Sequence, residues 1–180
     1  GRERSIPVNT IVNKINTLND LGYKEVVLTG TQLGTYGFDL VNTSISDLIS
    51  VIIAKTNIPR IRVSSLQPHE ITGELLELWE NNRLCPHFHI PLQSGSNDVL
   101  KNMRRRYTSD TFLSSLDTVK STIRNVAITT DVIVGFPGET LKDFEQTREI
   151  CMKSGFSDLH VFKFSRRPGT SAFYVCDDVL

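Results

Sequence analysis

Hydrophobic and polar positions along the chain follow two periodicities in turn. Between residues 7 and 22, apolar side chains recur every three or four positions, at Ile11, Val12, Ile15 and Leu18, which predicts an amphipathic helix. The same helical spacing returns at 44–57, 72–82, 96–123 (one or two helices) and 140–155, and in the last of these Thr140 and Asp143 have the spacing of a capping box. Short apolar runs rich in β-branched residues predict strands at 24–30, 60–65, 87–92, 126–135 and 158–164.

The order of these elements predicts the fold class. Five strands that alternate with helices are typical of an α/β fold, in which helices cover a parallel sheet. Each strand–helix unit takes roughly 30–40 residues, close to the repeat of a (β/α) barrel. A doubly wound open sheet is the alternative, because spacing alone does not show whether a sheet closes. In both folds, ligands bind beyond the carboxyl ends of the strands.

The predicted strand ends are rich in glycine and in small polar residues. In chain order, the five strands leave through LTGTQLGTYG, SSLQPHE, PLQSGS, GFPGET and FSRRPGT. Glycine lets a backbone approach a ligand closely, and Gln and Ser side chains both donate and accept hydrogen bonds. Five such ends in succession predict one shared binding site at one edge of the sheet.

Composition narrows the class of protein. The 180 residues contain 20 basic and 20 acidic side chains and are 39% hydrophobic, which is typical of a globular domain. The net charge of zero argues against a module that only binds RNA, since such modules are usually basic. No apolar run approaches the roughly 20 residues of a membrane helix, which predicts no membrane partner.

Cysteine and histidine positions predict no metal site. Cys85, Cys151 and Cys176 include no closely spaced pair of the kind that chelates zinc or iron, and thiols without a disulfide pattern are typical of a reducing cytoplasm. The four histidines show no ligand spacing and are expected to be ordinary hydrogen-bonded residues: His69, His87, His89 and His160.

Five ordered motifs carry a resemblance to a known family. LTGTQLGTYG, RIRVSSLQP, HFHIPLQSGSNDVLKNMRRRYT, AITTDVIVGFPGETLKDFE and LHVFKFSRRPGT are similar, in this order, to the radical S-adenosylmethionine core of the methylthiotransferases. Within that family, GRERS, RIRVSSLQP and TTDV resemble the branch that acts on threonylcarbamoyl-adenosine in tRNA. The isopentenyl-adenosine branch is the near alternative, and the ribosomal-protein branch is a further one.

The resemblance implies a particular fold and its boundaries. The expected fold is a partial (β/α) barrel of about five parallel strands with outer helices, over residues 1–165. Residues 166–180 are expected to begin a linker toward an RNA-binding domain. The CxxxCxxC run that binds the iron–sulfur cluster in this family does not occur in the chain. The first strand and the cluster loop are therefore expected to be missing, and the chain alone is expected to be inactive.

The resemblance also implies chemistry and partners for the whole enzyme. Its cofactors are S-adenosylmethionine and 4Fe–4S clusters whose ligands lie outside this chain. Reductive cleavage of S-adenosylmethionine gives a 5′-deoxyadenosyl radical that abstracts hydrogen from C2 of the adenine, and sulfur is then inserted and methylated. The implied substrate is a tRNA anticodon stem-loop, the reductant a flavodoxin or ferredoxin, and the location the cytoplasm.

Cofactor contacts follow from the same resemblance, and no catalytic residue is assigned. The methionine amino group is expected to meet the backbone of Gly30, Thr31 and Gln32. Ile133 and Gly135 correspond to the adenine contact. The remaining contacts, to the ribose, the methionine or the adenine edge, are expected from Ser64, Ser65, Gln93, Ser94, Phe162 and Phe164.

Three charged residues complete the expected site. Arg105 corresponds to the family's arginine, and a guanidinium can hold the methionine carboxylate with two hydrogen bonds. Asp131, on the strand that carries the adenine contact, is placed among the cofactor residues. Glu139 is expected to complement the dipole of the next helix, because it lies one residue beyond the common position in radical S-adenosylmethionine proteins.

A non-radical barrel lyase or synthase is the alternative of another class. Such an enzyme would carry a lysine at a strand end or a phosphate-binding loop. Lys163 lies within a predicted strand, and the chain contains no GxxxxGK[ST] run.

Overall fold

The computed structural model describes residues 4–174, and its elements follow the predicted alternation. The helices are α1 (Val8–Asp20), α2 (Ile45–Lys55), α3 (Gly73–Glu77), α4 (Asn97–Asn102), α5 (Ser109–Thr122) and α6 (Leu141–Ser154). The strands are β1 (Glu25–Leu28), β2 (Arg60–Val63), β3 (His87–His89), β4 (Ala127–Val134) and β5 (Asp158–Lys163). Short 3₁₀ turns lie between or after them: η1 (Leu33–Thr35), η2 (Pro68–Glu70), η3 (Leu78–Glu80) and η4 (Ser171–Tyr174).

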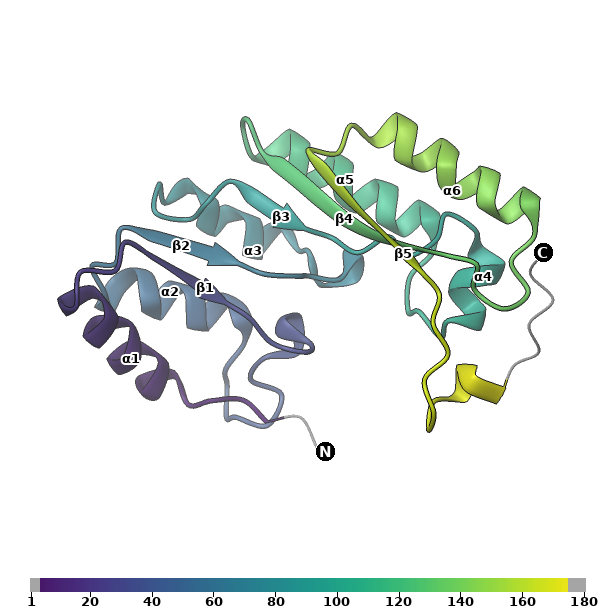
Figure 1. Cartoon of the computed structure of the whole chain (residues 1–180). Helices are drawn as coiled ribbons and strands as arrows, with labels where there is room; N and C mark the ends of the chain where they lie inside the picture. Colours follow the sequence, from purple (N-terminus) through teal and green to yellow (C-terminus); the bar gives the residue numbers. More distant parts are fainter. Residues whose placement is uncertain (1–3, 175–180) are drawn as a thin grey trace.

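The five strands are parallel and lie side by side in chain order (Figure 1). β1 pairs with β2, and β3, β4 and β5 pair in that order. Between the two groups, the Leu66 N–H donates to the His89 carbonyl at 3.1 Å. A doubly wound sheet reverses its strand order near the middle, so that alternative is wrong. Within residues 4–174 the sheet does not close, because β1 and β5 each pair with a single strand.

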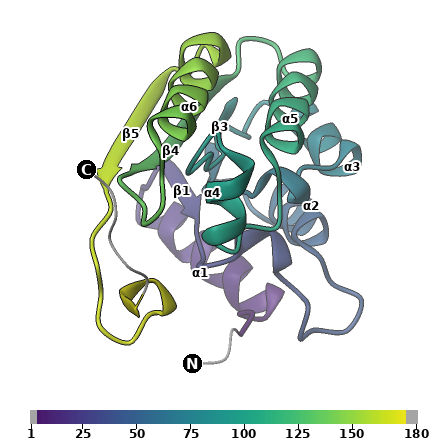
Figure 2. The same ribbon diagram turned by 90° about the vertical axis from the view of Figure 1, so that its right-hand side faces the viewer.

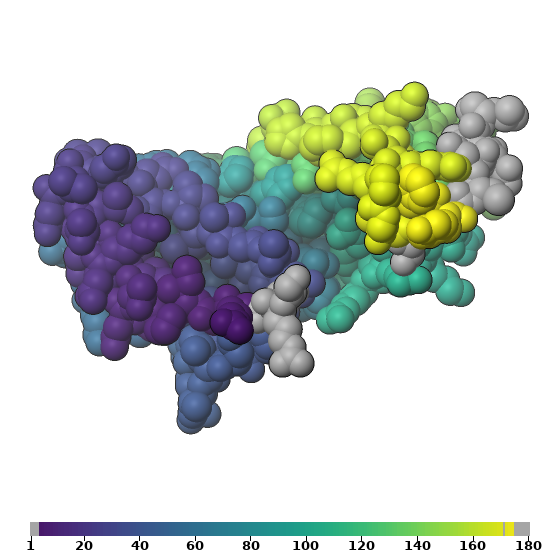
Figure 3. Space-filling view, turned by 60° about the horizontal axis from the view of Figure 1, so that its bottom comes forward, coloured from purple at the N-terminus to yellow at the C-terminus, as the bar shows by residue number. Residues whose placement is uncertain are grey.

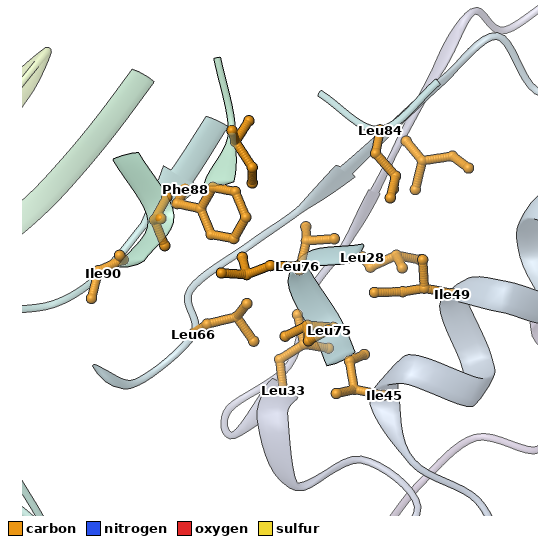
Figure 4. Packing of buried hydrophobic residues seen from close by; sticks show 14 of the residues in the cluster. Leu28, Leu33, Ile45, Ile49, Leu66, Leu75, Leu76, Leu84, Phe88 and Ile90 are labelled. Atoms are coloured by element: carbon orange, nitrogen blue, oxygen red, sulfur yellow. The ribbon is translucent and has the colours of Figure 1, made fainter. Parts of the chain in front are cut away.

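One face of the sheet packs against the helices and forms the core. Seen end-on, α2, α3, α5 and α6 lie along one side of the strands (Figure 2). Leu28 and Phe88 point to this side and are buried against the helices, where Ile49 of α2 is fully enclosed (Figure 4). Ile61 of β2 belongs to the same buried cluster. Enclosing a side chain of this size contributes about 1.5–3 kcal/mol. The helix-facing side of the sheet is therefore the main source of stability.

Side-chain caps fix the helices that follow β3 and β4. The Thr140 hydroxyl accepts from the Asp143 N–H at 3.2 Å, and the Asp143 carboxylate accepts from the Thr140 N–H at 2.9 Å. This confirms the capping box predicted at the start of α6. Ser96, the N-cap of α4, also donates its hydroxyl to Asp143 at 2.5 Å. Hydrogen bonds from Ser96 and then Thr140 lower the pKa of Asp143. One carboxylate thus ties together the starts of α4 and α6.

None of the helices within residues 4–174 is both long and apolar enough to cross a membrane.

Candidate cofactor site at the strand ends

Because the strands run parallel, the carboxyl ends of all five strands lie at the same end of the sheet. This end of the sheet is called the open edge. In the space-filling view, the middle of the chain (teal) is set back between the N-terminal part (purple) and the residues after β5 (yellow) (Figure 3). The molecule is thus hollowed on this face.

The segment after β1 is accessible. Gly30, Thr31 and Gln32 are exposed and line a groove of about 500 Å³ that runs between α1 and β1. The next glycine serves packing, because a Cβ at Gly34 would lie 2.2 Å from the side chain of Glu70. The predicted methionine-binding backbone is therefore free to meet a ligand.

The end of β2 continues the sheet and then turns outward. The Ser64 N–H donates to the Leu28 carbonyl at 2.9 Å, which extends the pairing of β1 with β2 by one residue. Ser64 is half-buried and Ser65 is exposed. Of the two predicted serines, Ser65 is thus the more accessible.

The loop after β3 gives two of the predicted contact residues, Gln93 and Ser94, different surroundings. Gln93 has φ +65° and is tied to β4 through the Asp131 carbonyl and the Ile133 N–H. The Ser94 side chain is 0% exposed, and its hydroxyl lies 3.2 Å from that of Thr147 on α6. The structure therefore corrects the expectation for Ser94, whose hydroxyl packs the loop against α6 and does not reach the open edge.

Gly135, at the end of β4, has the geometry expected of a close approach. Its φ is +73°, and a Cβ built there would have no atom within 4 Å. Its N–H donates to Glu139 Oε2 at 2.6 Å, and burial raises the pKa of Glu139. Glu139 therefore closes the GFPG turn, and Thr140 and Asp143 cap α6 directly after it. The interaction of Glu139 with the dipole of that helix stays a prediction.

Two phenylalanines of the last strand region lie beside this glycine turn. Phe162 is 52% exposed and stands opposite Ile133 in the strand register. Phe164 is half-buried and meets Phe136 edge-on, with ring centroids 5.1 Å apart. Ile133 and Phe162 thus offer an apolar surface that is suited to a flat base. They lie on the face of the sheet opposite the helices, which is called the open face.

Arg105 follows α4 and has an unpaired donor. Among the described residues, its Nε is enclosed without a hydrogen-bond partner. A buried guanidinium nitrogen left unpaired is costly, and a carboxylate ligand would satisfy it. Tyr107 nearby holds the loop before Gln93, since its hydroxyl donates to the Pro91 carbonyl at 2.9 Å and burial raises its pKa to about 12. Sequence reasoning did not single out this tyrosine.

The open face below the strand ends carries a polar network. Asp131 Oδ2 lies 3.1 Å from His89 Nε2, and Asp131 Oδ1 lies 3.1 Å from His160 Nδ1. His89 Nδ1 lies 3.0 Å from the hydroxyl of Thr129. Both oxygens of Asp131 are therefore engaged by imidazoles, and its assignment to the cofactor remains a prediction.

The described cysteines do not suit an iron–sulfur cluster. Cys85 is buried before β3, and Cys151 lies half-buried on α6, where burial raises the pKa of its thiol. Neither lies at the strand ends, and Cys176 falls outside the described residues. In contrast, the exposed backbone after β1, the open space at Gly135 and the unpaired Arg105 nitrogen all suit S-adenosylmethionine.

Comparison with known proteins defines the class. The family profile described as "Radical SAM superfamily" matches residues 1–151. The radical S-adenosylmethionine methyltransferase TsrM from Kitasatospora setae, solved with cobalamin and a 4Fe–4S cluster, shares the fold with a TM-score of 0.70, at 13% identity over 89% of this chain and 31% of that chain. The chain belongs to the radical SAM superfamily.

Curated relatives narrow the likeness further. The threonylcarbamoyladenosine tRNA methylthiotransferase MtaB of Bacillus subtilis is 41% identical over 99% of this chain and 40% of its own length. The tRNA-2-methylthio-N(6)-dimethylallyladenosine synthase of Finegoldia magna is 36% identical over 99% of this chain and 39% of its own length. The chain thus spans about two fifths of the curated relatives it matches.

Proposed function

We propose that this chain is the S-adenosylmethionine-binding part of a tRNA-modifying enzyme that adds a methylthio group at C2 of a hypermodified adenosine beside the anticodon. Similarity to relatives named as tRNA methylthiotransferases, over 99% of the chain, supports the reaction class. The observation that carries the cofactor assignment is the open edge of the sheet, where Gly135 leaves space beside the apolar pair Ile133 and Phe162.

In this proposal, the strand ends hold different parts of the cofactor. Backbone carbonyls of residues 30–32 accept from the methionine ammonium, since each carbonyl is a fixed dipole. Arg105 pairs with the methionine carboxylate, which gives its Nε a partner. When bound and reduced by one electron at a 4Fe–4S cluster, S-adenosylmethionine supplies a carbon radical strong enough to remove hydrogen from an aromatic C–H bond.

The adenine lies on Ile133 and Phe162, with Gly135 at its edge. In the proposal, the exposed Ser65 and the largely buried Gln93 hydrogen-bond the ribose, and Ser64 and Phe164 border the same edge. These residues bind and orient the cofactor while the hollowed face admits the substrate. Residues 1–165 form this core and residues 166–180 begin the connection to an RNA-binding part. A flavodoxin or ferredoxin supplies the electron, in the cytoplasm.

Threonylcarbamoyl-adenosine is the proposed substrate base, supported by 41% identity to the Bacillus subtilis relative. Isopentenyl-adenosine is the second candidate, because a relative named for dimethylallyladenosine is 36% identical over the same share of the chain.

Analysis of tRNA nucleosides tests the choice of substrate. The longer protein that carries this chain is expressed in two bacterial strains, each lacking one of the two methylthiotransferases, and tRNA digests are examined by mass spectrometry. We expect the methylthio form of threonylcarbamoyl-adenosine to return and that of isopentenyl-adenosine to stay absent. The reverse result would make isopentenyl-adenosine the substrate base. If neither methylthio nucleoside returned, the proposed reaction would be wrong.

A further inference from the structure

Three neighbouring strands bring two imidazoles and a carboxylate to one point on the open face. His89 comes from β3, Asp131 from β4 and His160 from β5. One ligand atom from each side chain lies within 4.8 Å of the others. The strand register fixes this placement, because Asp131 stands opposite His160 and His89 opposite Thr129. The cluster therefore rests on the sheet itself, which is more rigid than a loop.

The second nitrogen of each imidazole also has an oxygen nearby. His89 Nδ1 lies 3.0 Å from the Thr129 hydroxyl, and His160 Nε2 lies 3.6 Å from the Asp158 carboxylate. Histidines that ligate metals nearly always direct their other ring nitrogen at such an oxygen, which fixes the tautomer and the ring orientation. The nitrogens that remain, His89 Nε2 and His160 Nδ1, are the two that converge on Asp131.

We propose that His89, Asp131 and His160 bind a divalent transition-metal ion, of which Zn²⁺ is the type. Two imidazoles and one carboxylate are ligands that zinc and its neighbours accept. Calcium and magnesium require mostly oxygen ligands, so they do not suit this set. One carboxylate and two neutral imidazoles leave a single positive charge on the bound ion. The His160 side chain is half-exposed, so the fourth coordination position of the metal ion is open to water or to a ligand atom.

This site is separate from the proposed cofactor contacts except at Asp131. Ile133 lies two residues further along the same face of β4, toward the strand end. The metal site is thus placed next to the adenine surface. Asp131 is then a metal ligand. It does not touch S-adenosylmethionine itself and affects the cofactor only through neighbouring residues. The inference does not depend on the reaction proposed above.

Metal titration of the 180-residue chain tests the site. The metal-free chain is titrated with Zn²⁺ by calorimetry and with Co²⁺ by visible absorption. We expect one equivalent to bind, with a four- or five-coordinate Co²⁺ spectrum that lacks the near-ultraviolet band of a thiolate ligand. That absence separates this site from Cys85 and Cys151.

Matched variants assign the ligands. His160→Gln and Asp131→Asn should each weaken binding by more than about 100-fold, since loss of an outer partner alone costs roughly 10–100-fold. Asp158→Asn should weaken it about tenfold. His69→Gln is the control, because His69 is exposed on η2 and outside the cluster. Circular dichroism checks that each variant folds. We expect His160→Gln to disturb folding least, because the His160 side chain is half-exposed on β5.

Three outcomes would overturn the proposal. Wild-type chain that binds no Zn²⁺ would leave the cluster as a hydrogen-bonded triad. Equal affinity in His160→Gln and wild type would show that the ion binds elsewhere. A thiolate band in the Co²⁺ spectrum would move the site to the cysteines.

Discussion

The two faces of the sheet are built from the same strands and follow different rules. Along β3, Phe88 points to the helices and is 2% exposed, whereas His87 and His89 on either side point to the open face. Along β4, Val132 is buried and Asp131 before it is not. Successive side chains of a strand point to opposite faces, so a single strand serves both purposes.

The difference between the faces lies in what their residues must satisfy. The helix-facing side has only to fill volume, and several apolar residues do this comparably well. The open side holds titratable groups that are costly to bury unless each finds a partner. There, Glu25 pairs with Arg60 and Arg62 at 2.8 Å, and hydrogen bonds from Arg62 and then Arg60 lower its pKa. Stability is concentrated on one face and chemistry on the other.

Phenylalanine truncation on each face gives the largest contrast. Phe88→Ala should lower the free energy of unfolding by about 3–5 kcal/mol, because Phe88 is enclosed against Trp79 and leaves a cavity. Phe162→Ala should cost less than about 1 kcal/mol, since its ring is half-exposed on the open face. Urea unfolding followed by circular dichroism measures both. Equal losses would mean that the open face is as much a core as the other.

Substitution of Gly135 tests the open edge with a large effect on the cofactor. In a protein that carries this chain together with the cluster-binding motif, Gly135→Val should weaken S-adenosylmethionine binding by at least about 100-fold, or ~2.7 kcal/mol. A branched side chain would fill the space beside Ile133 and Phe162 that is now open. The positive φ adds strain of about 1–3 kcal/mol to folding.

Gly138→Val is the matched control for that strain. Gly138 has φ +83° and likewise has no atom within 4 Å of a built Cβ, but it lies further into the turn. Calorimetric titration measures cofactor binding in both variants. An equal loss in the two would show that backbone strain causes the effect and that the adenine does not lie against Gly135.

Much of the fold was predictable because helix and strand periodicity record burial directly. The alternation of elements and the capping box of Thr140 and Asp143 follow from residues close in sequence, and both are confirmed. The cluster around Asp131 was missed because it depends on the register of strands. His89 and His160 lie 42 and 29 residues from Asp131, so no local pattern records their meeting. Ser94 was misassigned for a similar reason, since its partner Thr147 lies on a helix 53 residues away.

Removal of the Arg105 side chain tests the same binding site and should have a smaller effect on S-adenosylmethionine binding. In the longer protein, Arg105→Ala should weaken S-adenosylmethionine binding about tenfold to a hundredfold, roughly 1.5–3 kcal/mol, through loss of a charge-assisted hydrogen bond. Arg104→Ala is the control, because Arg104 is exposed and carries the same charge one residue earlier. Calorimetry that gave equal losses for both arginines would remove the special role of Arg105 and leave only a general attraction of positive charge.

The smallest expected effect concerns the carboxylate that ties the loops of the open edge to the helix layer. Asp143 has a pKa below its ordinary value because Ser96 and Thr140 donate to it. Its contribution to stability is therefore complete above the ordinary pKa of about 3.9 and is lost as pH falls through the lowered value. Asp143→Asn should cost about 1 kcal/mol or less at pH 7, and the difference from wild type should shrink in acid below pH ~4. Glu149→Gln serves as the control, since Glu149 pairs with Lys153 on the exposed side of α6. Thermal unfolding across this pH range measures both variants. A wild-type advantage that persisted unchanged in acid would show that Asp143 acts through its shape and not through its charge, and the tie between the starts of α4 and α6 would then be a matter of packing alone.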